Sequence, residues 1–519
     1  MRRMLSVLAA CGLCAAGAQA WAQDNSAEPV TIVVDAKAPG KPFPHFWEDM
    51  FGSGRANLAM RQSYRDDLDR VRKATAFHYV RFHGIFDDEN GVYGENAQGN
   101  PVYNWSYVDQ IYDGLLDHNI RPFVEISFMP KALAKTDQPH AFWYKPIPSP
   151  PADYAKWDAL ITAFAKHLIE RYGADEVASW YFEVWNEPNI DFWIGKPAQE
   201  TYFELYDHTA RALKAVSDQI RVGGPATAQA AWVGDMIAHA TQNDVPLDFV
   251  STHVYGNDST MDVFHDNRPM APHQMVCPAV EKVHEEIAKS AKPQMPLIWS
   301  EFNATYMNQQ EITDSIYMGP WMADTISKCD GKTEMMSYWS FSDVFEEQGV
   351  VKTPFYGGYG LVAEDGIPKP AYDVFQLLHS LGNERLPAPV DDALVTRRDD
   401  GTLVLAAWNL VEPGAGELGA GNKQVIFDLQ GLDLLHTQTK HVLAGIQIGA
   451  KAYVRRVDAA HGDTLDAWKR MGSPKYPTQE QIDELRKDAD VGPPEEMPIH
   501  NHRLVLTLPP MGLAVIEVR

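Results

Sequence analysis

The sequence predicts an α/β protein built on a (β/α)8 barrel, followed by a smaller C-terminal β-sandwich domain. Three observations lead to this prediction. Between about residues 45 and 380, short apolar runs alternate with amphipathic helical stretches. Two of these runs lead directly to a glutamate, Glu187 in one case and Glu301 in the other. After about Asp391 the helical pattern gives way to short apolar segments separated by Gly, Pro and Asn turns.

Eight apolar runs are expected to form the strands of the barrel, because they are rich in β-branched and aromatic residues and lack a helical period. They are Phe46–Phe51, Tyr79–His83, Pro122–Ser127, Ser179–Trp185, Ile220–Gly224, Asp248–His253, Leu297–Glu301 and Met335–Ser340. The helices expected between them include Ser63–Ala76, Tyr107–His118, Tyr154–Tyr172, Gln199–Ser217, Ala279–Ala291 and Asp314–Lys328. A closed barrel explains eight strand–helix units over roughly 330 residues better than a doubly wound open sheet does.

The chain divides into four expected parts: a signal peptide at 1–22, an N-terminal segment at 23–44, the catalytic barrel at 45–385 and the β-sandwich at 386–519. The expected strands of the last part are Leu403–Leu410, Gln424–Leu429, Lys451–Val457 and Arg503–Leu508. An early strand, Val30–Val34, is a candidate to pair with this domain, which would make the domain discontinuous. Tyr476–Glu496 is expected to be a surface excursion from it.

The overall charge excludes some classes of partner. The chain carries a formal net charge of −25 and has a pI near 5.1. Nucleic acid and anionic membranes both require a basic face, so neither is an expected partner. An acidic surface is ordinarily a solvated one and does not identify a substrate. No segment after the N-terminal apolar run is apolar enough to span a bilayer, and nothing in the sequence specifies the oligomeric state.

The N-terminus resembles a secretory signal. Two arginines precede a short apolar run that ends near Ala18, and Ala20–Ala22 offers an A-x-A cleavage site. The mature protein is therefore expected to be secreted or periplasmic; a lipoprotein anchor at Cys11 is the lesser alternative. Only Cys277 and Cys329 remain in the mature chain, and whether they form a disulfide stays open.

The segment that leads to Glu187 is the most informative stretch. Trp180–Trp185 has the composition of a buried strand, and Pro188 then ends the ladder because proline has no backbone N–H. The segment before Glu301 has the same character. In a (β/α)8 barrel the carboxyl ends of the strands carry the catalytic groups. A pair of glutamates there suggests glycoside hydrolysis, and the alternative is that both make structural ion pairs. Glu183 lies deeper and is read as an interior contact.

Several segments together resemble glycoside hydrolase family 39, the family of β-xylosidases and α-L-iduronidases. They are Phe182–Asn189, Ile298–Asn303, Val80–Gly84, Ser251–Tyr255 and Tyr338–Glu347. They lie at or near the ends of expected barrel strands, in the order of the chain. The C-terminal part resembles the accessory β-sandwich of the family only in outline.

The resemblance implies a retaining enzyme, with Glu187 as acid/base and Glu301 as nucleophile. The two carboxyl groups would then lie about 5–5.5 Å apart. Asn186 would bond the 2-hydroxyl of the sugar, and Tyr255 would orient Glu301 through its phenol. His253 would lie near the acid/base or near the sugar.

Seven further residues are candidates for sugar binding. His83 is expected to bind hydroxyls, although a lone histidine is more often a satisfied core residue. Glu346 and Glu347 are expected to accept hydrogen bonds from sugar hydroxyls, with solvated surface charges as the alternative. Trp339 offers a flat apolar face to the sugar ring. Trp143 is a stacking candidate together with its neighbours Phe142 and Tyr144, and the alternative is that they are ordinary packed aromatic residues of their loop.

The sequence therefore predicts a retaining exo-glycosidase that releases xylose from xylo-oligosaccharides or related glycosides, with no metal and no cofactor. An α-L-iduronidase-like enzyme would need a cation or a backbone nest for the substrate carboxylate. Glu346 and Glu347 would instead repel that carboxylate. A β-glucosidase, an arabinosidase and an exopolysaccharide hydrolase remain alternatives. A catalytically silent carbohydrate-binding protein on the same barrel is the rival of a different class.

Overall fold

The computed structural model of the chain describes residues 29–414, 421–432 and 451–519, and the expected signal peptide lies outside these ranges. Eight parallel strands close into a barrel in the order β3-β4-β7-β8-β9-β10-β11-β12. Their bounds are Met50–Arg55, Tyr79–His83, Arg121–Ile126, Tyr181–Val184, Arg221–Thr227, Phe249–Tyr255, Leu297–Asn303 and Met335–Tyr338. The predicted (β/α)8 barrel is confirmed.

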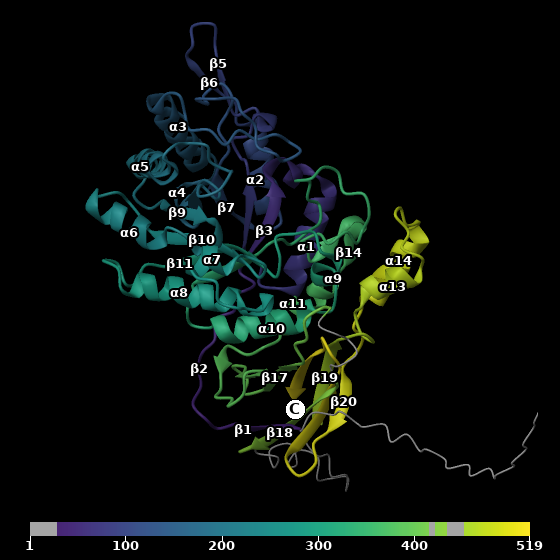
Figure 1. Cartoon of the computed structure of the whole chain (residues 1–519). Helices are drawn as coiled ribbons and strands as arrows, with labels where there is room; N and C mark the ends of the chain where they lie inside the picture. The colour runs from purple at the N-terminus through teal and green to yellow at the C-terminus, as the bar shows by residue number, and fades with distance from the viewer. Residues whose placement is uncertain (1–28, 415–420, 433–450) are drawn as a thin grey trace, which may run out of the picture.

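Helices surround the barrel, as Figure 1 shows. They are α1 (Gln62–Ala74), α2 (Ser106–Asp117), α3 (Tyr154–Tyr172), α4 (Ala174–Ala178), α5 (Ala198–Val216), α6 (Val233–Gln242), α7 (Thr260–Phe264), α8 (Val276–Ala288), α9 (Gln310–Thr313), α10 (Met318–Cys329) and α11 (Pro370–His379). All six expected helices are present within a few residues. The sequence reading missed α6 and α11, and it began the first barrel strand four residues too early, at Phe46 instead of Met50.

The helix α3 illustrates why these segments form where they do. Asp153 caps its N-terminus by accepting from two backbone N–H groups, and Gly173, with φ of 88°, follows its last residue. Between these ends, one stripe of apolar side chains is buried, including Trp157 and Phe164. A helix with one apolar stripe gains stability by burying it against the barrel.

The interior of the barrel changes in character from one end to the other. Near the N-terminal ends of the strands it is filled by apolar side chains, namely Met50, Phe123, Phe249, Ile298 and Met335. Further along the strands the interior side chains are charged and fully buried, and include Arg81, Glu125 and Glu183. The apolar layer closes the bottom of the barrel, so the barrel interior is open to a ligand from its C-terminal end.

The C-terminal strands form two sheets that pack on a common apolar core. The larger sheet has the order β2-β15-β16-β17-β22-β19-β20, with bounds Lys41–Pro42, Glu384–Arg385, Ala393–Arg397, Leu403–Trp408, Leu513–Val518, Lys451–Val457 and Glu495–Pro498. The smaller sheet joins β1 (Val30–Asp35), β18 (Lys423–Gln430) and β21 (Arg503–Leu508). Strand β1 runs parallel to β18, so a strand that precedes the barrel completes the predicted β-sandwich.

The segment expected to be a surface excursion instead packs against the barrel. Helices α13 (Thr464–Arg470) and α14 (Gln479–Asp488) bury Trp468 and Leu485 against the hairpin of β13 (Val362–Ala363) and β14 (Ile367–Pro368). Figure 1 shows both helices beside β14, at some distance from the sandwich. The amphipathic character of α14 accounts for this, because its apolar side chains require a partner surface.

Two further features concern the surface and the covalent chain. A disulfide joins Cys277 in α8 to Cys329 at the end of α10, with the two Cα atoms 5.3 Å apart. A hairpin of β5 (Tyr93–Glu95) and β6 (Pro101–Tyr103) projects at the top of Figure 1. In the described part of the chain, no helix combines the length and apolarity needed to cross a membrane.

Candidate active site

A cavity of about 380 Å³ lies at the C-terminal end of the barrel. Eight of the twelve candidate site residues from the sequence line it: His83, Phe142, Asn186, Glu187, Tyr255, Glu301, Trp339 and Glu347. The other four, Trp143, Tyr144, His253 and Glu346, do not. This volume falls within the usual range for small-ligand pockets.

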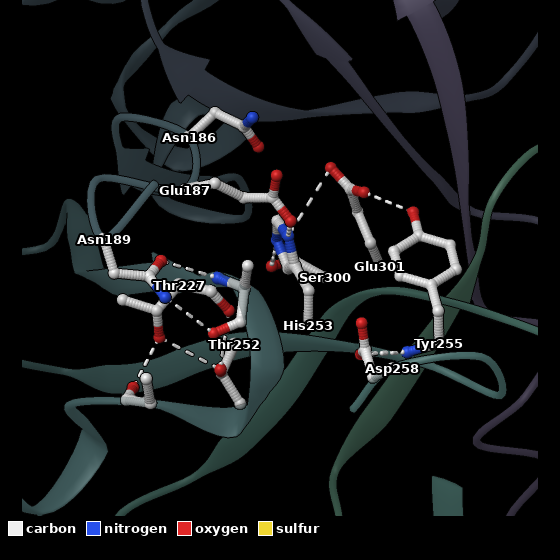
Figure 2. A network of polar contacts seen from close by, with 12 residues as sticks. Asn186, Glu187, Asn189, Thr227, Thr252, His253, Tyr255, Asp258, Ser300 and Glu301 are labelled. Atoms are coloured by element: carbon white, nitrogen blue, oxygen red, sulfur yellow. Dashed lines mark hydrogen bonds and ion pairs between the residues drawn. The ribbon is translucent and has the colours of Figure 1, made fainter. Parts of the chain in front are cut away.

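Glu187 and Glu301 face each other across this cavity, as Figure 2 shows. One carboxylate oxygen of Glu187 lies within 4.8 Å of one carboxylate oxygen of Glu301. Glu301 belongs to β11, whereas Glu187 lies three residues beyond the end of β8. The backbone at Glu187 has a φ of 42° and that at Trp185 a φ of 74°, a region that non-glycine residues rarely adopt. Such strain is common where a side chain must be held in a functional position.

Arg81 in β4 bonds to Glu301 in β11 and to Asn186, which follows β8. Its side chain is fully buried and donates to Glu301 Oε1 at 2.6 Å, to Asn186 Oδ1 at 2.9 Å and to Glu183 Oε2 at 2.5 Å. Its Nη2 also lies 2.9 Å from Glu125 Oε2. Charge-assisted bonds of this kind are short and directional. Arg81 therefore positions both Glu301 and Asn186.

Tyr255 contacts Glu301 from the neighbouring strand. Its phenol donates to Glu301 Oε2 at 2.5 Å, while its backbone N–H donates to Asp258 at 2.8 Å. Burial, together with the negative charge of Glu301, raises the pKa of Tyr255 well above its usual value. The phenol therefore keeps its proton and acts as a donor. Each oxygen of Glu301 thus accepts one strong hydrogen bond.

His253 lies behind Glu187 and does not reach the cavity. Its Nδ1 lies 3.0 Å from Glu187 Oε1, and its Nε2 lies 3.1 Å from the hydroxyl of Ser300. Burial and the positive charges of Arg81 and His83 hold the pKa of His253 well below its usual range, so the ring is neutral. A neutral imidazole donates from one of its nitrogens and accepts at the other, so His253 links Glu187 to Ser300.

The environment of Glu187 favours its protonated form. Burial raises the pKa of Glu187 well above 4.5, and the negative charges of Glu301, Asp258 and Glu347 raise it further, against the opposing charge of Arg81. The site therefore offers one carboxyl group whose protonated form is favoured, beside a second carboxylate that is bonded to a guanidinium.

Glu347 and His83 form one wall of the cavity. His83 Nδ1 lies 2.8 Å from Glu125 Oε2, and its Nε2 faces Glu347 Oε1 at 3.7 Å. Burial raises the pKa of Glu347 to about 8, assisted by the charges of Glu301 and Glu125 and opposed by that of His83. The ring of Trp339 lies 4.9 Å from the His83 ring, centroid to centroid.

Two predicted ligands face away from the cavity. Glu346 accepts from Arg61 at 2.7 Å and from Arg55 at 3.1 Å, so its charge serves to anchor the loop after the eighth barrel strand. The side chain of Trp143 is half exposed outside the cavity, and its neighbour Phe142 supplies the lining aromatic ring. In a loop, adjacent side chains point in different directions, and composition alone does not reveal which one faces inward.

Comparison with known proteins places this site in a family. The model of the glycosyl hydrolases family 39 matches residues 30–501. The chain belongs to glycosyl hydrolase family 39. A β-xylosidase of Geobacillus stearothermophilus is 37% identical over 468 residues, which cover 87% of this chain and 88% of the relative. A β-xylosidase of Caldicellulosiruptor saccharolyticus is 36% identical, with 86% and 88% covered. The structure of a family 39 β-xylosidase from Caulobacter crescentus superposes with a TM-score of 0.80 at 33% identity, covering 94% of this chain and 99% of that one.

The cavity of this family 39 enzyme also contains residues that the sequence reading did not single out. They are Ile190, Phe192, Ala228, Gln229, Asp258, Tyr306, Gln348 and Tyr359. Most of them lie in loops beyond the strand ends, where no periodicity indicates direction. Arg81 carried a usable signal, because it lies within an otherwise apolar and aromatic strand and shares the parity of His83.

Proposed function

We propose that this chain is a retaining exo-β-xylosidase that removes xylose from the ends of xylo-oligosaccharides by double displacement. Membership of family 39 makes it a glycoside hydrolase. Two relatives that are more than one third identical over most of their length are β-xylosidases, which supports the choice of sugar.

The spacing of the two carboxyl groups carries the mechanistic part of the proposal. Retaining glycosidases hold their carboxyl groups about 5–5.5 Å apart, whereas inverting enzymes need about 6.5–9.5 Å to place a water molecule between the sugar and the base. The oxygens of Glu187 and Glu301 that lie within 4.8 Å of each other fit the shorter spacing. Glu301 therefore has direct access to the anomeric carbon.

In the first step Glu301 attacks the anomeric carbon, and the bond to the leaving oxygen breaks. Glu187 donates its proton to that oxygen, so the leaving group departs as a neutral alcohol. Arg81 and Tyr255 hold the two oxygens of Glu301 in place for the attack. The product of this step is a glycosyl-enzyme ester on Glu301.

The second step reverses the role of Glu187. Esterification removes the negative charge of Glu301, which is one of the causes of the raised pKa of Glu187. The pKa of Glu187 then falls, and the deprotonated carboxylate can take a proton from water as that water attacks the anomeric carbon. The ester bond breaks, Glu301 leaves as a carboxylate, and xylose is released with its original anomeric configuration.

The polar lining suits a neutral sugar. Asn186 faces the cavity while Arg81 holds its carbonyl oxygen, so its amide N–H₂ is left to donate to a sugar hydroxyl. Glu347 and His83 line the same cavity, where they can accept from and donate to further hydroxyls. Trp339 supplies a flat apolar face in the same cavity.

A uronic acid is a poorer fit, although for a different reason from the one that the sequence suggested. Glu346 is paired with two arginines outside the cavity, and the pKa of Glu347 is raised to about 8, so repulsion by two charged acids is not the main obstacle. The cavity lining within the described part of the chain contains no lysine or arginine. His83 is the one cation candidate of that lining, and its ring already faces Glu125 and Glu347, so a substrate carboxylate would have to compete with both for it.

We also propose that the mature enzyme works outside the cytoplasm, in the periplasm or the medium. The signal-like residues 1–22 and the disulfide between Cys277 and Cys329 support this, because such bonds persist in oxidising compartments. Cell fractionation followed by N-terminal sequencing tests it, with Gln23 expected as the first residue. A cytoplasmic chain that begins at Met1 would overturn the proposal, and a lipidated start at Cys11 would replace it with membrane anchoring.

Hydrolysis of nitrophenyl β-xyloside, β-glucoside, α-arabinoside and α-iduronide tests the activity. Wild type, Glu301→Ala, Glu187→Ala and the surface control Glu176→Ala should be compared on each substrate. We expect xyloside turnover that is lost in Glu301→Ala and kept in Glu176→Ala, with β-xylose as the first anomer seen by NMR. If only another glycoside were hydrolysed, xylose would be the wrong sugar. If α-xylose appeared first, the enzyme would be inverting and not retaining. If none of the four substrates were hydrolysed, the proposed activity would be wrong.

The products formed with added azide distinguish the acid/base, Glu187, from the nucleophile, Glu301. In Glu187→Ala the nitrophenolate leaves without protonation, and azide then attacks the glycosyl-enzyme to give β-xylosyl azide. In Glu301→Ala azide enters on the side vacated by the nucleophile and gives α-xylosyl azide by a single inversion. The opposite pairing of products would exchange the two assignments.

A further inference from the structure

A second cluster of potential ligands lies at the end of the barrel opposite the active site. His45 and Glu48 precede β3, so they lie at the N-terminal end of that strand. His379 is the last residue of α11, and helices of this fold run antiparallel to the strands, which brings it to the same end. The backbone N–H of Ala76, which precedes β4, also donates to Glu48.

Both imidazoles direct the same nitrogen toward one carboxylate. His45 Nδ1 lies 2.7 Å from Glu48 Oε1, and His379 Nδ1 lies 2.9 Å from Oε1 and 3.0 Å from Oε2. Three ligand atoms, one from each residue, lie within 4.8 Å of one another. In the described ranges of the chain, only one other set of three His, Cys, Asp or Glu residues meets this condition, and it contains Glu187 and Glu301.

We propose that His45, Glu48 and His379 bind one divalent transition-metal ion of the zinc type. Two imidazole nitrogens and one carboxylate oxygen are a ligand set that zinc uses, and zinc accepts a water molecule as its fourth ligand. Neutral imidazoles and a carboxylate also select against Mg²⁺ and Ca²⁺, which prefer oxygen ligands. The structure carries no ion, so the proposal rests on the donor set and its convergence.

The surroundings are compatible with such an ion. Glu48 is fully buried, so its negative charge lies where a cation is most favourable, while the side chain of His379 is 47% exposed and leaves an approach from solvent. Bonds of about 2.0–2.1 Å to a tetrahedral ion would separate neighbouring ligand atoms by about 3.3 Å. The nitrogen–oxygen distances of 2.7–3.0 Å therefore need to widen by only a few tenths of an ångström.

The ion would cross-link the segment before β3 to the C-terminal end of α11. His45 and His379 are far apart in the sequence, and α11 is the helix that packs against α1 and α10 to complete the ring. His45 is itself held in place by stacking on Trp47, with ring centroids 4.5 Å apart. A ligand that binds the folded chain alone raises the unfolding temperature. The expected role is therefore structural, at a distance from the chemistry.

Zinc binding to the purified chain, first stripped with a chelator, tests the proposal. Bound zinc is counted by mass spectrometry after dialysis, and the unfolding temperature is measured with and without Zn²⁺. We expect one zinc per chain and a higher unfolding temperature in zinc, for wild type and for the control His208→Ala, whose histidine is paired with Asp158 elsewhere. His379→Ala should bind zinc at least tenfold more weakly and show no such rise. Mg²⁺ should give neither effect.

A third variant separates this site from the catalytic one. Glu187→Gln disrupts the other set of three ligands and should retain the zinc that His379→Ala loses. Zinc that survives His379→Ala and is lost with Glu187→Gln would place the ion in the active site and overturn the proposal, as would a wild type that binds none. If His379→Ala fails to fold, Co²⁺ is added to wild type and to Glu187→Gln instead. We expect both proteins to show the visible absorption bands of a four-coordinate Co²⁺ ion. The absence of these bands would overturn the proposal.

Discussion

The phenol oxygen of Tyr255 lies 2.5 Å from Oε2 of Glu301, and this bond joins the ends of two adjacent barrel strands. Arg81 holds the other oxygen of Glu301 at 2.6 Å from a third strand. The proposed nucleophile is thus oriented by side chains that are themselves fixed in the strands. A side chain held from two directions loses little freedom when the substrate arrives, which favours direct attack.

Replacing Tyr255 by Phe should lower kcat by about 10–100-fold, because it removes a hydrogen bond to a charged group worth about 1.5–3 kcal/mol. The ring remains, so KM should change much less. Steady-state kinetics on nitrophenyl β-xyloside measure both constants. Tyr79→Phe is the matched control, since its phenol donates to Ser179 at the opposite end of the barrel. A kcat equal to that of the control would remove Tyr255 from the mechanism.

Replacing Arg81 by Lys should lower both kcat and the unfolding temperature. One ammonium group cannot reproduce the guanidinium bonds to Glu301, Asn186 and Glu183. Leaving buried carboxylates unpaired costs about 3–5 kcal/mol, and kcat should fall by at least about 100-fold. Kinetics and calorimetry are compared with Arg121→Lys, which alters a half-exposed pair with Glu176. Full activity in Arg81→Lys would contradict the positioning role.

Replacing Asp258 by Asn should shift the alkaline limb of kcat/KM to lower pH, by about half a unit. Burial raises the pKa of Asp258 to about 7, so above that pH its charge helps Glu187 to retain the catalytic proton. Without that charge Glu187 loses its proton at a lower pH. An asparagine oxygen can still accept from the Tyr255 N–H. The surface control Asp266→Asn should leave the alkaline limb of kcat/KM at its wild-type pH. If Asp258→Asn left it there as well, Asp258 would not influence the pKa of Glu187.

Much of the fold follows from the sequence because a barrel repeats one simple pattern. Buried parallel strands require continuous apolar runs, and these runs alternate with amphipathic helices. Where a segment departed from that pattern the reading failed. The short glycine-containing helix α6 and the helix α11, which begins at a proline, were both overlooked.

The site was predictable where side chains sit on strands and much less so where they sit on loops. Period-two alternation places Tyr255 on the same interior side of its strand as Phe249, and Tyr255 lines the cavity. Glu301 also lines it, but it is three residues from the interior residue Ile298, and a register irregularity between Trp299 and Phe302 turns it inward. Glu346 and Glu347 are adjacent in a loop, and only the second faces the cavity. The first is drawn away by Arg55 and Arg61, two residues almost 300 positions earlier, and no local signal reveals such partners.

That anchoring leads to a prediction for Glu346. Replacing it by Gln removes the charge from the ion pairs with Arg55 and Arg61, and we expect the loop that carries Glu347 to loosen. Because Arg61 is substantially exposed and the buried Arg55 keeps its ion pair with Glu89, the loss should be only about 1 kcal/mol, which corresponds to a roughly fivefold rise in KM with kcat little changed. Glu176→Gln, at a surface ion pair, is the control for kinetics on the xyloside. An unchanged KM would mean that the loop is held by other contacts.

Reduction of the disulfide should destabilise the enzyme without lowering its activity at 25 °C. The bond joins α8 to α10 across 52 residues, on the outside of the barrel and away from the cavity. Closing a loop of that size restricts the unfolded chain by about 4 kcal/mol. With an unfolding entropy of about 1 kcal/mol per kelvin for a chain of this length, the melting temperature should fall by about 4 °C. Scanning calorimetry with and without dithiothreitol measures the shift. The variant with Cys277→Ala and Cys329→Ala should melt at the lower temperature in both conditions; if dithiothreitol lowered its melting temperature as well, the effect would not arise from this bond.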